Sequence, residues 1–434
     1  MVVLIDTMII KNSLLLAIFS ILSVLLGIVR DRLLATNIGV GPMLDIYNAA
    51  FRLPDLLYAF SLAFVTAGTV VPYLTIENKN GDIVDPRHKL SSVALFFGGV
   101  ISLIGIIIAI TVPLYAHSIV PGFTEEQVSM FIDITRVLMI QPILLGLTSL
   151  ISCFAQMKNH FVLYGVSPLG YSLGIIFGIS FLYPRYGLMG LIYGVLLGAL
   201  LSFLIQAWSL RGTHMLEVLP YFSIKHIKEL FRLALPRTGV NVLTQARSIF
   251  FTAIATTLGP GALSSYLFAQ RITEAIQQII QQSVTTASLP VLSKEVVEHR
   301  IKEYKSVVKK YVLILGVVGV IASSTVYFLQ DMVIWLLYGE TDAHTTIAFF
   351  LDGFLVALPL QMMIGYFTIS LYSAKDTKSV FYSNFVSVFC AVGVCYSTQY
   401  LGNSSLVYGV VTMSVVNFIT LFFAYTSKNF IKLH

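Results

Sequence analysis

Charged side chains stand inside segments that are otherwise apolar enough for a lipid bilayer. Between Gly27 and Pro72 the chain carries three arginines and three aspartates among aliphatic and aromatic runs: Arg30, Asp31, Arg32, Asp45, Arg52 and Asp55. A charge at bilayer depth is costly, so such residues normally face a protein interior or a water-filled cavity. The stretch predicts the end of one transmembrane helix, a short outer loop, and a second helix over roughly 44–75 that lines a cavity.

Polar residues recur at helical spacing, and residues three or four apart share one face of a helix. The second predicted helix carries one such stripe: Asp45, Asn48, Arg52 and Asp55. The eighth carries another: Arg271, Glu274, Gln278 and Gln281 or Gln282. The seventh adds several more, with Arg247 nearby: Arg237, Asn241, Thr244, Ser248 and Thr252. These stripes predict a polar cavity within the membrane.

The balance of charge in this cavity favours an anion. Arginine stays charged at any relevant pH, and its planar fork of donors matches phosphate. Five arginines are predicted to bind the substrate: Arg30, Arg52, Arg237, Arg247 and Arg271. Four acidic residues are predicted at its acidic or gating positions: Asp31, Asp45, Asp55 and Glu274. The alternative is that Arg52–Asp55 and Arg271–Glu274 are intrahelical pairs with a structural role only, as we expect for Arg136 beside Asp133.

Other chemistry finds little support in the sequence. Asp352 lies alone in the tenth predicted helix and is a candidate for coupling to a cation, with a hydrogen-bonded packing role as the alternative. No HExxH, Walker A motif or nucleophile–base pair is evident, so we expect neither an enzyme nor ATP-driven transport by this chain alone. The three cysteines lack a CxxC spacing and are expected in the core. We therefore predict no metal site and no cofactor apart from an unidentified coupling cation.

The elements that must position these residues are transmembrane helices. Of the 434 residues 57% are hydrophobic and 11% charged, against about 25% charged in a soluble domain. The sequence predicts an all-α polytopic membrane protein with about twelve helices of about 20 residues each. Lysines and arginines concentrate on alternate connecting segments, which places both termini in the cytoplasm by the positive-inside rule.

The two halves of the sequence resemble each other at a spacing of about 218 residues. Ile38–Gly41 precedes Arg52 as Leu258–Gly261 precedes Arg271, and Leu191–Val195 matches Leu406–Val410. An even number of helices per half gives two parallel repeats around a central cavity, which suits a transporter that rocks one bundle against the other. We predict three parts: a six-helix bundle over 1–211, a cytoplasmic linker over 212–233, and a second six-helix bundle over 234–434. The linker holds either an interfacial helix or the start of the seventh helix.

Several motifs resemble a known family. Gly27–Asp31 (GIVRD), Ile38–Gly41 (IGVG) and Phe51–Asp55 (FRLPD) are similar to the opening signature of the MurJ/MviN lipid II flippases, of the multidrug/oligosaccharidyl-lipid/polysaccharide exporter superfamily. Pro121–Phe123 and Phe268–Glu274 also resemble this family. The resemblance implies a bacterial inner-membrane flippase that moves lipid II, a polyprenyl-pyrophosphate-linked peptidoglycan precursor, to the outer leaflet by alternating access. It assigns Arg30 and Arg271 to the cavity arginines, and Asp31, Asp45 and Glu274 to the acidic positions.

The chain also departs from the family pattern. Val24 and Tyr58 stand where the family has arginines, and Gln270 replaces an aspartate. Well-known members carry fourteen helices, so the chain is identified as a divergent twelve-helix member in which Arg237 and Arg247 are hypothesised to compensate. Two alternatives stay open: a flippase for another lipid-linked oligosaccharide, and a cation-coupled multidrug exporter. The expected partners are a lipid-linked anion and membrane lipids, without nucleic acid, and the chain is expected to be a monomer.

Overall fold

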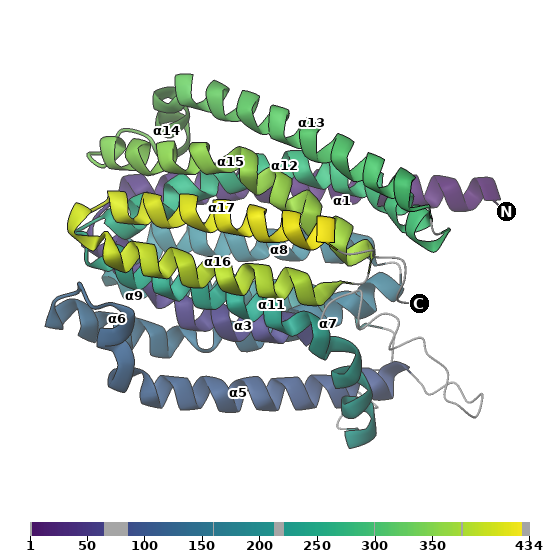
Figure 1. The fold of residues 1–434 in the computed structure, drawn as a ribbon. Helices are drawn as coiled ribbons and strands as arrows, with labels where there is room; N and C mark the ends of the chain where they lie inside the picture. The colour runs from purple at the N-terminus through teal and green to yellow at the C-terminus, as the bar shows by residue number, and fades with distance from the viewer. Residues whose placement is uncertain are drawn as a thin grey trace. The chain divides into compact units, whose positions relative to one another are not determined.

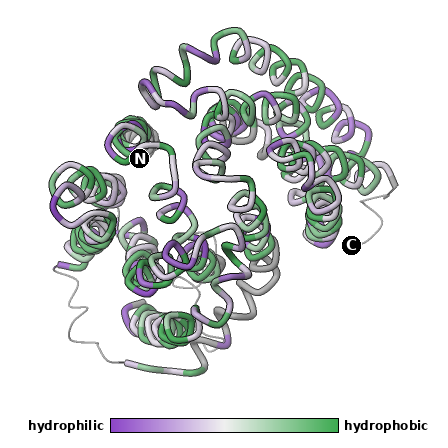
Figure 2. Tube along the Cα trace, turned by 90° about the vertical axis from the view of Figure 1, so that its left-hand side faces the viewer, coloured by the Kyte–Doolittle hydropathy of each residue, from purple (hydrophilic) through white to green (hydrophobic). Residues whose placement is uncertain are grey.

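The computed structural model describes residues 2–64, 86–158, 160–211, 221–298, 300–374 and 376–427. These residues are predominantly helical, and no strand occurs among them (Figure 1). Hydrophobic residues predominate along most helices (Figure 2). The predicted all-α polytopic fold is confirmed.

Eight stretches of the described residues are long and apolar enough to cross a bilayer. One of them, Phe161–Trp208, has 48 residues and can cross twice, because one crossing takes about 20 residues. Helices α11 (Ile224–Thr256) and α12 (Ala262–Val297) are also long enough, but they are more polar. These are the predicted seventh and eighth helices. Their polar stripes lower the mean hydropathy, so hydropathy alone does not identify them as transmembrane helices.

The chain divides into two compact units. Unit 1 comprises Met1–Gly39, Ile46–His117 and Thr124–Gln245, and unit 2 comprises Val40–Asp45, Ser118–Phe123 and Ala246–His434. Unit 2 therefore takes two short segments from the first half of the sequence. The division falls within α11, after Gln245, and the predicted bundles and linker stay a prediction.

Unit 1 holds the helices of the first half. They are α1 (Val2–Asn37), α3 (Arg52–Phe64), α5 (Pro86–Ile119), α6 (Glu125–Leu138), α7 (Gln141–Met157), α8 (Phe161–Phe177) and α9 (Tyr183–Trp208), with a π-helical turn at Gly178–Leu182. Helices α8 and α9 pack closely along glycines, because a Cβ atom at Gly174 would lie 2.2 Å from the Cα of Gly198. Ser167 and Ser202 join the same helices, since each hydroxyl donates to the other residue's carbonyl.

The second predicted helix is broken into two. Helix α2 spans Pro42–Ala50 and α3 spans Arg52–Phe64, with a turn at Phe51. Pro54 accounts for the break, because a proline ring clashes with the carbonyl four residues earlier, here that of Ala50. The predicted stripe from Asp45 to Asp55 is therefore not one continuous helix face. Asp45 belongs to unit 2, whereas Arg52 and Asp55 belong to unit 1.

Unit 2 is built around α15. Its other helices are the second part of α11, α12, α13 (Ile301–Phe328), α14 (Gln330–Tyr338), α16 (Thr377–Ser397) and α17 (Ser404–Ser427), and α15 spans His344–Ser373. Helix α15 packs against α12, α13 and α17, and α16 packs against α17 (Figure 1). Gly319 lets α13 approach α15, because a Cβ there would lie 2.7 Å from the Cα of Pro359.

Two local features bear on the sequence expectations. Gly39 and Gly259, which are equivalent in the predicted duplication, both have positive φ angles of 81° and 117°, a conformation that favours glycine. Each lies three residues before the first residue of a helix, α2 or α12. Helix α11 runs without interruption from Ile224. Residues 224–233, the second part of the predicted linker, are therefore the start of the seventh helix. Residues 212–220 of the predicted linker lie outside the described residues.

Candidate functional site

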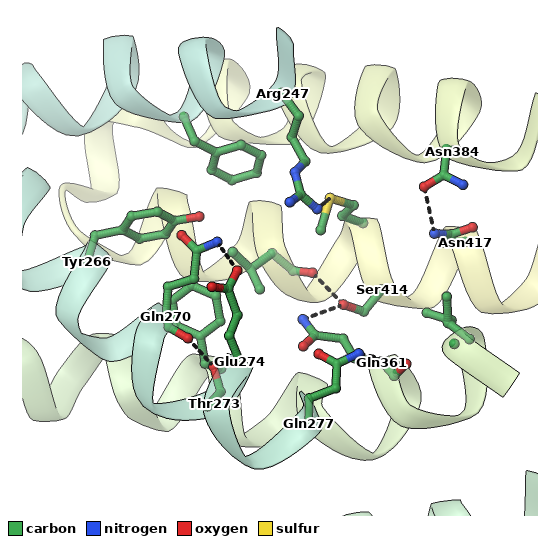
Figure 3. A pocket seen from close by; sticks show the side chains of 16 residues that line it. Arg247, Tyr266, Gln270, Thr273, Glu274, Gln277, Gln361, Asn384, Ser414 and Asn417 are labelled. Atoms are coloured by element: carbon green, nitrogen blue, oxygen red, sulfur yellow. Dashed lines mark hydrogen bonds between the residues drawn. The ribbon is translucent and has the colours of Figure 1, made fainter. Parts of the chain in front are cut away.

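Unit 2 contains a pocket of about 270 Å³ that is lined by α11, α12, α15, α16 and α17 (Figure 3). Most of its lining side chains are polar or aromatic: Arg247, Phe251, Tyr266, Gln270, Thr273, Glu274, Gln277, Phe354, Gln361, Asn384, Ser414 and Asn417. Ile364, Gly365, Val410 and Met413 complete the wall. Polar groups at this density inside membrane helices usually mark a substrate or ion pathway.

Helix α12 presents one of its faces to this pocket. Gln270, Thr273, Glu274 and Gln277 all line it, and they recur at the three- or four-residue spacing of one helix face. Arg271 and Gln278 lie about 100° and 80° round the helix from Gln270, so they belong to the neighbouring face. The predicted stripe through Arg271, Glu274 and Gln278 is therefore split, and Glu274 lies with Gln270 and Gln277.

Amide side chains make two separate sets of hydrogen bonds along the pocket wall. On α12, Gln270 Nε2 donates to Glu274 Oε1 at 2.6 Å. Gln277 Nε2 donates to the backbone carbonyl of Gln361 on α15 at 3.3 Å. Gln361 Nε2 in turn donates to Ser414 Oγ on α17 at 3.4 Å. These bonds hold the polar walls of three helices together (Figure 3).

A pair of asparagines forms the far end of the same pocket. Asn417 Nδ2 on α17 donates to Asn384 Oδ1 on α16 at 3.4 Å. Asn417 Oδ1 accepts a bond from the hydroxyl of Ser383 at 2.6 Å. Asn384 also donates to the carbonyl of Val380. Both asparagines are thus oriented by neighbours on their own two helices.

Arg247 enters the pocket from α11 (Figure 3). Its Nη1 lies 3.6 Å from the sulfur of Met413, and a thioether is a weak acceptor. Within the described ranges Arg247 forms no ion pair, although Glu274 lines the same pocket. The pocket therefore holds one cation and one anion that do not neutralise each other directly.

The remaining predicted residues of unit 2 lie elsewhere. Arg271 is half-buried on α12, and its guanidinium carbon is 5.9 Å from the ring centroid of Phe268. Asp352 is half-buried on α15, and its Oδ1 has no hydrogen-bond partner among the described residues. Arg237 belongs to the part of α11 in unit 1, and its side chain lies outside the described part of the chain, so its prediction is not tested. Of the ten site residues predicted from the sequence, Arg247 and Glu274 are the two that line this pocket among the described residues.

Asp45 is the most buried of the predicted residues, at 2% exposed. Its Oδ2 accepts from the backbone N–H of Gly261 at 2.6 Å. Its Oδ1 accepts from the backbone N–H of Ser264 at 2.8 Å and from the Ser264 hydroxyl at 2.6 Å. The carboxylate therefore caps the N-terminus of α12, where unpaired amides and the helix dipole favour negative charge.

The predicted residues of unit 1 lie on α1 and α3. The guanidinium of Arg30 contacts Oδ1 of Asp31 through Nε and Nη2, both at 2.9 Å. Arg52 and Asp55 are half-buried at the start of α3. Tyr58, which stands at a position where the family has arginine, shares a hydrogen bond with the hydroxyl of Ser149 at 3.2 Å. The site roles predicted for these residues stay predictions.

The pocket residues that sequence reasoning missed include four polar ones on α15, α16 and α17: Gln361, Asn384, Ser414 and Asn417. These residues lie in predominantly apolar helices and carry no charge, so the search for charged stripes passed over them, although Ser414 and Asn417 are three residues apart on α17. The signal available was their type, because an amide inside a membrane helix needs a partner there. No cluster of metal-ligating side chains occurs in the part of the chain that the structure describes.

Comparisons with known proteins agree on one family. The sequence model of the family described as "Lipid II flippase MurJ" matches residues 34–433. The lipid II flippase MurJ of Burkholderia cenocepacia is 26% identical over 398 residues, which cover 88% of this chain and 75% of that protein. The probable lipid II flippase MurJ of Buchnera aphidicola subsp. Baizongia pistaciae is 26% identical over 435 residues, covering 95% and 83%.

Solved structures show the same fold. A lipid II flippase MurJ in an inward closed conformation has a TM-score of 0.80 at 20% identity, with 95% of this chain and 87% of that chain covered. An inward-facing multidrug resistance MATE transporter has a TM-score of 0.76 at 17% identity, with 93% and 94% covered. The two solved structures share the fold, and the family model extends over most of the sequence. The chain therefore belongs to the family of lipid II flippases, MurJ.

Proposed function

We propose that this protein moves lipid II from the inner to the outer leaflet of a bacterial cytoplasmic membrane by alternating access. The observation that carries the proposal is the family match over residues 34–433. The polytopic helical fold and the charged residues held within its helices support it, because lipid II carries an anionic pyrophosphate. Both termini are proposed to face the cytoplasm, in keeping with the basic inner segments.

The arginines are proposed to bind the pyrophosphate. Arg30 and Arg52 in unit 1 and Arg271 in unit 2 each offer a fork of donors that matches phosphate oxygens. Asp31 and Asp55 are proposed to hold and release the arginines of unit 1 during the transport cycle. Asp352 is proposed to couple the cycle to a cation, since its Oδ1, in an apolar helix, has no hydrogen-bond partner within the described part of the chain.

A multidrug exporter is the second candidate, favoured by the structural match to a MATE transporter. That match shows the fold alone. A cation-coupled exporter of cationic drugs needs an acidic cavity, whereas the predicted cavity residues are richer in arginine than in carboxylates. Ethidium efflux from cells that express the protein distinguishes the two, and we expect none above the vector control.

Complementation tests the proposed function. A bacterial strain depleted of its own lipid II flippase receives the parent chain, Arg271→Gln or Arg136→Gln. Arg136 is a matched control because its side chain is 45% exposed and, within the described ranges, pairs with Asp133 and the carbonyl of Ala109. We expect growth with the parent and Arg136→Gln but not with Arg271→Gln, at equal amounts in the membrane. A parent chain that is present in the membrane but does not restore growth would contradict the proposal.

A further inference from the structure

We propose that the pocket of unit 2 binds the peptide portion of the lipid-linked head group, while the pyrophosphate binds elsewhere. This inference rests on the proposed function and assigns a part of the substrate to a site. The juxtaposition that carries it is one arginine without an ion-pair partner among the described residues, Arg247, and one carboxylate, Glu274, in a pocket whose other lining residues there are uncharged.

The charge of the pocket argues against a pyrophosphate. Arg247 and Glu274 cancel in formal charge, and among the described residues no lysine or second arginine lines the pocket. A bound pyrophosphate needs several cationic side chains around it, since burying an anion without them is unfavourable. Glu274 would also repel it. The pocket therefore suits a group that is neutral overall.

The separation of the two charges favours a zwitterion. Arg247 meets only the Met413 sulfur within the described ranges, so its guanidinium donors face the pocket largely unused. Among the described residues, Glu274 accepts a hydrogen bond from Gln270 through Oε1 only. A ligand with a carboxylate near Arg247 and an ammonium near Glu274 would give both side chains an oppositely charged partner. A peptide with free acidic and basic groups has this chemistry, whereas a simple sugar has neither charge.

The neutral lining matches peptide bonds. Each glutamine and asparagine side chain offers two N–H donors and one carbonyl acceptor, as a peptide group offers one of each. Gln361 and Asn417 make bonds of 3.4 Å through one N–H each, which are longer than the usual 2.9–3.0 Å or so. A ligand amide can replace these bonds at little cost. The amide-rich wall therefore complements a backbone that alternates donors and acceptors.

The aromatic residues argue against a sugar subsite. Phe251, Tyr266 and Phe354 line the pocket but are only 3%, 6% and 5% exposed. Tyr266 stacks on Phe251 with ring centroids 6.0 Å apart and packs on Phe354 at 5.2 Å. Their faces are occupied by one another, so no open ring is left on which a sugar could stack. The volume of 270 Å³ is at the low end of ligand pockets, about 300–1,000 Å³, and fits a fragment of a head group.

Equilibrium binding of two lipids tests the inference. The purified full chain in nanodiscs is titrated with lipid II and with the same polyprenyl-pyrophosphate disaccharide lacking the peptide. We expect the parent to bind lipid II about tenfold more tightly than the peptide-free lipid, equivalent to about 1.4 kcal/mol. Arg247→Gln is expected to lose most of this difference and to bind the peptide-free lipid as the parent does. Arg300→Gln, which changes an arginine outside the pocket paired with Glu295 and Glu298, should keep it.

The outcomes separate the inference from the proposed function. A parent that binds neither lipid would contradict both. A parent that binds both lipids equally, or an Arg247→Gln variant that weakens both to the same degree, would overturn the peptide assignment and leave the proposed function standing. Gln361→Ala provides a second variant without a charge change, and it is expected to weaken lipid II binding selectively. Monodisperse elution of each variant verifies its fold.

Discussion

The capping of α12 by Asp45 makes a quantitative prediction. The carboxylate accepts three hydrogen bonds, from the Gly261 amide, the Ser264 amide and the Ser264 hydroxyl, at 2.6–2.8 Å. Bonds to a charged group each contribute about 1.5–3 kcal/mol net. Asp45→Asn keeps one oxygen but turns an NH₂ group toward a backbone donor. We therefore expect it to lose about 3 kcal/mol of local stability, which is roughly a hundredfold increase in local opening.

Hydrogen exchange measured by mass spectrometry reads this opening directly. The peptide that covers residues 258–266 contains both backbone donors, and its exchange reports the opening of the first turn of α12. We expect its slow amides to exchange roughly a hundredfold faster in Asp45→Asn than in the parent. Ser264→Ala removes the hydroxyl alone and should accelerate exchange by about tenfold, for a loss of about 1–1.5 kcal/mol.

The control is Asp342→Asn, which removes an exposed carboxylate from the same unit and should leave this peptide unchanged. Exchange in Asp45→Asn that stays within about threefold of the parent would refute the reasoning, because it would place the bond energy below 1 kcal/mol or so. Exchange that rises equally in the Asp342→Asn control would also refute it, since the effect would then not be local to Asp45.

Two glycine substitutions test the close approaches in each unit. Gly122→Ala would place a Cβ 1.9 Å from the carbonyl oxygen of Thr256, and overpacking of this kind costs about 1–3 kcal/mol. We expect a lower temperature of half-unfolding in detergent for this variant. An unchanged temperature would contradict the close packing. Gly174→Ala would place a Cβ 2.2 Å from the Cα of Gly198 and should lower the same temperature, whereas Gly393→Ala, with no atom within 4 Å of a Cβ, should not.

The sequence was sufficient for the helical class because the apolar runs are long and the charged residues few. Of the polar residues that it named on α11 and α12, Arg247 and Glu274 line the pocket, and the site roles stay a prediction. The details depend on the register of each helix. The predicted stripe through Arg271, Glu274 and Gln278 is rotated from the face that lines the pocket, which carries Gln270, Glu274 and Gln277, and only the packing of α12 on α15 selects that face.

Contacts between distant residues escaped the sequence analysis for a different reason. Asp45 caps a helix that begins more than two hundred residues later, and nothing in its own stretch indicates that partner. The asparagines of the pocket, Asn384 and Asn417, come from two apolar helices and meet only because α16 packs on α17. The break at Phe51 was within reach, since Pro54 and its clash with Ala50 are local.

Translocation of lipid II in proteoliposomes tests the central claim most directly. Radiolabelled lipid II is placed in both leaflets, a membrane potential and a cation gradient are imposed, and a membrane-impermeant hydrolase that cleaves the pyrophosphate is added outside. With the parent chain we predict that hydrolysis proceeds beyond the outer-leaflet share of the lipid, whereas with Arg271→Gln it stops at that share. Hydrolysis that stops at the outer-leaflet share with the parent, or that is as complete with Arg271→Gln as with the parent, would contradict the account.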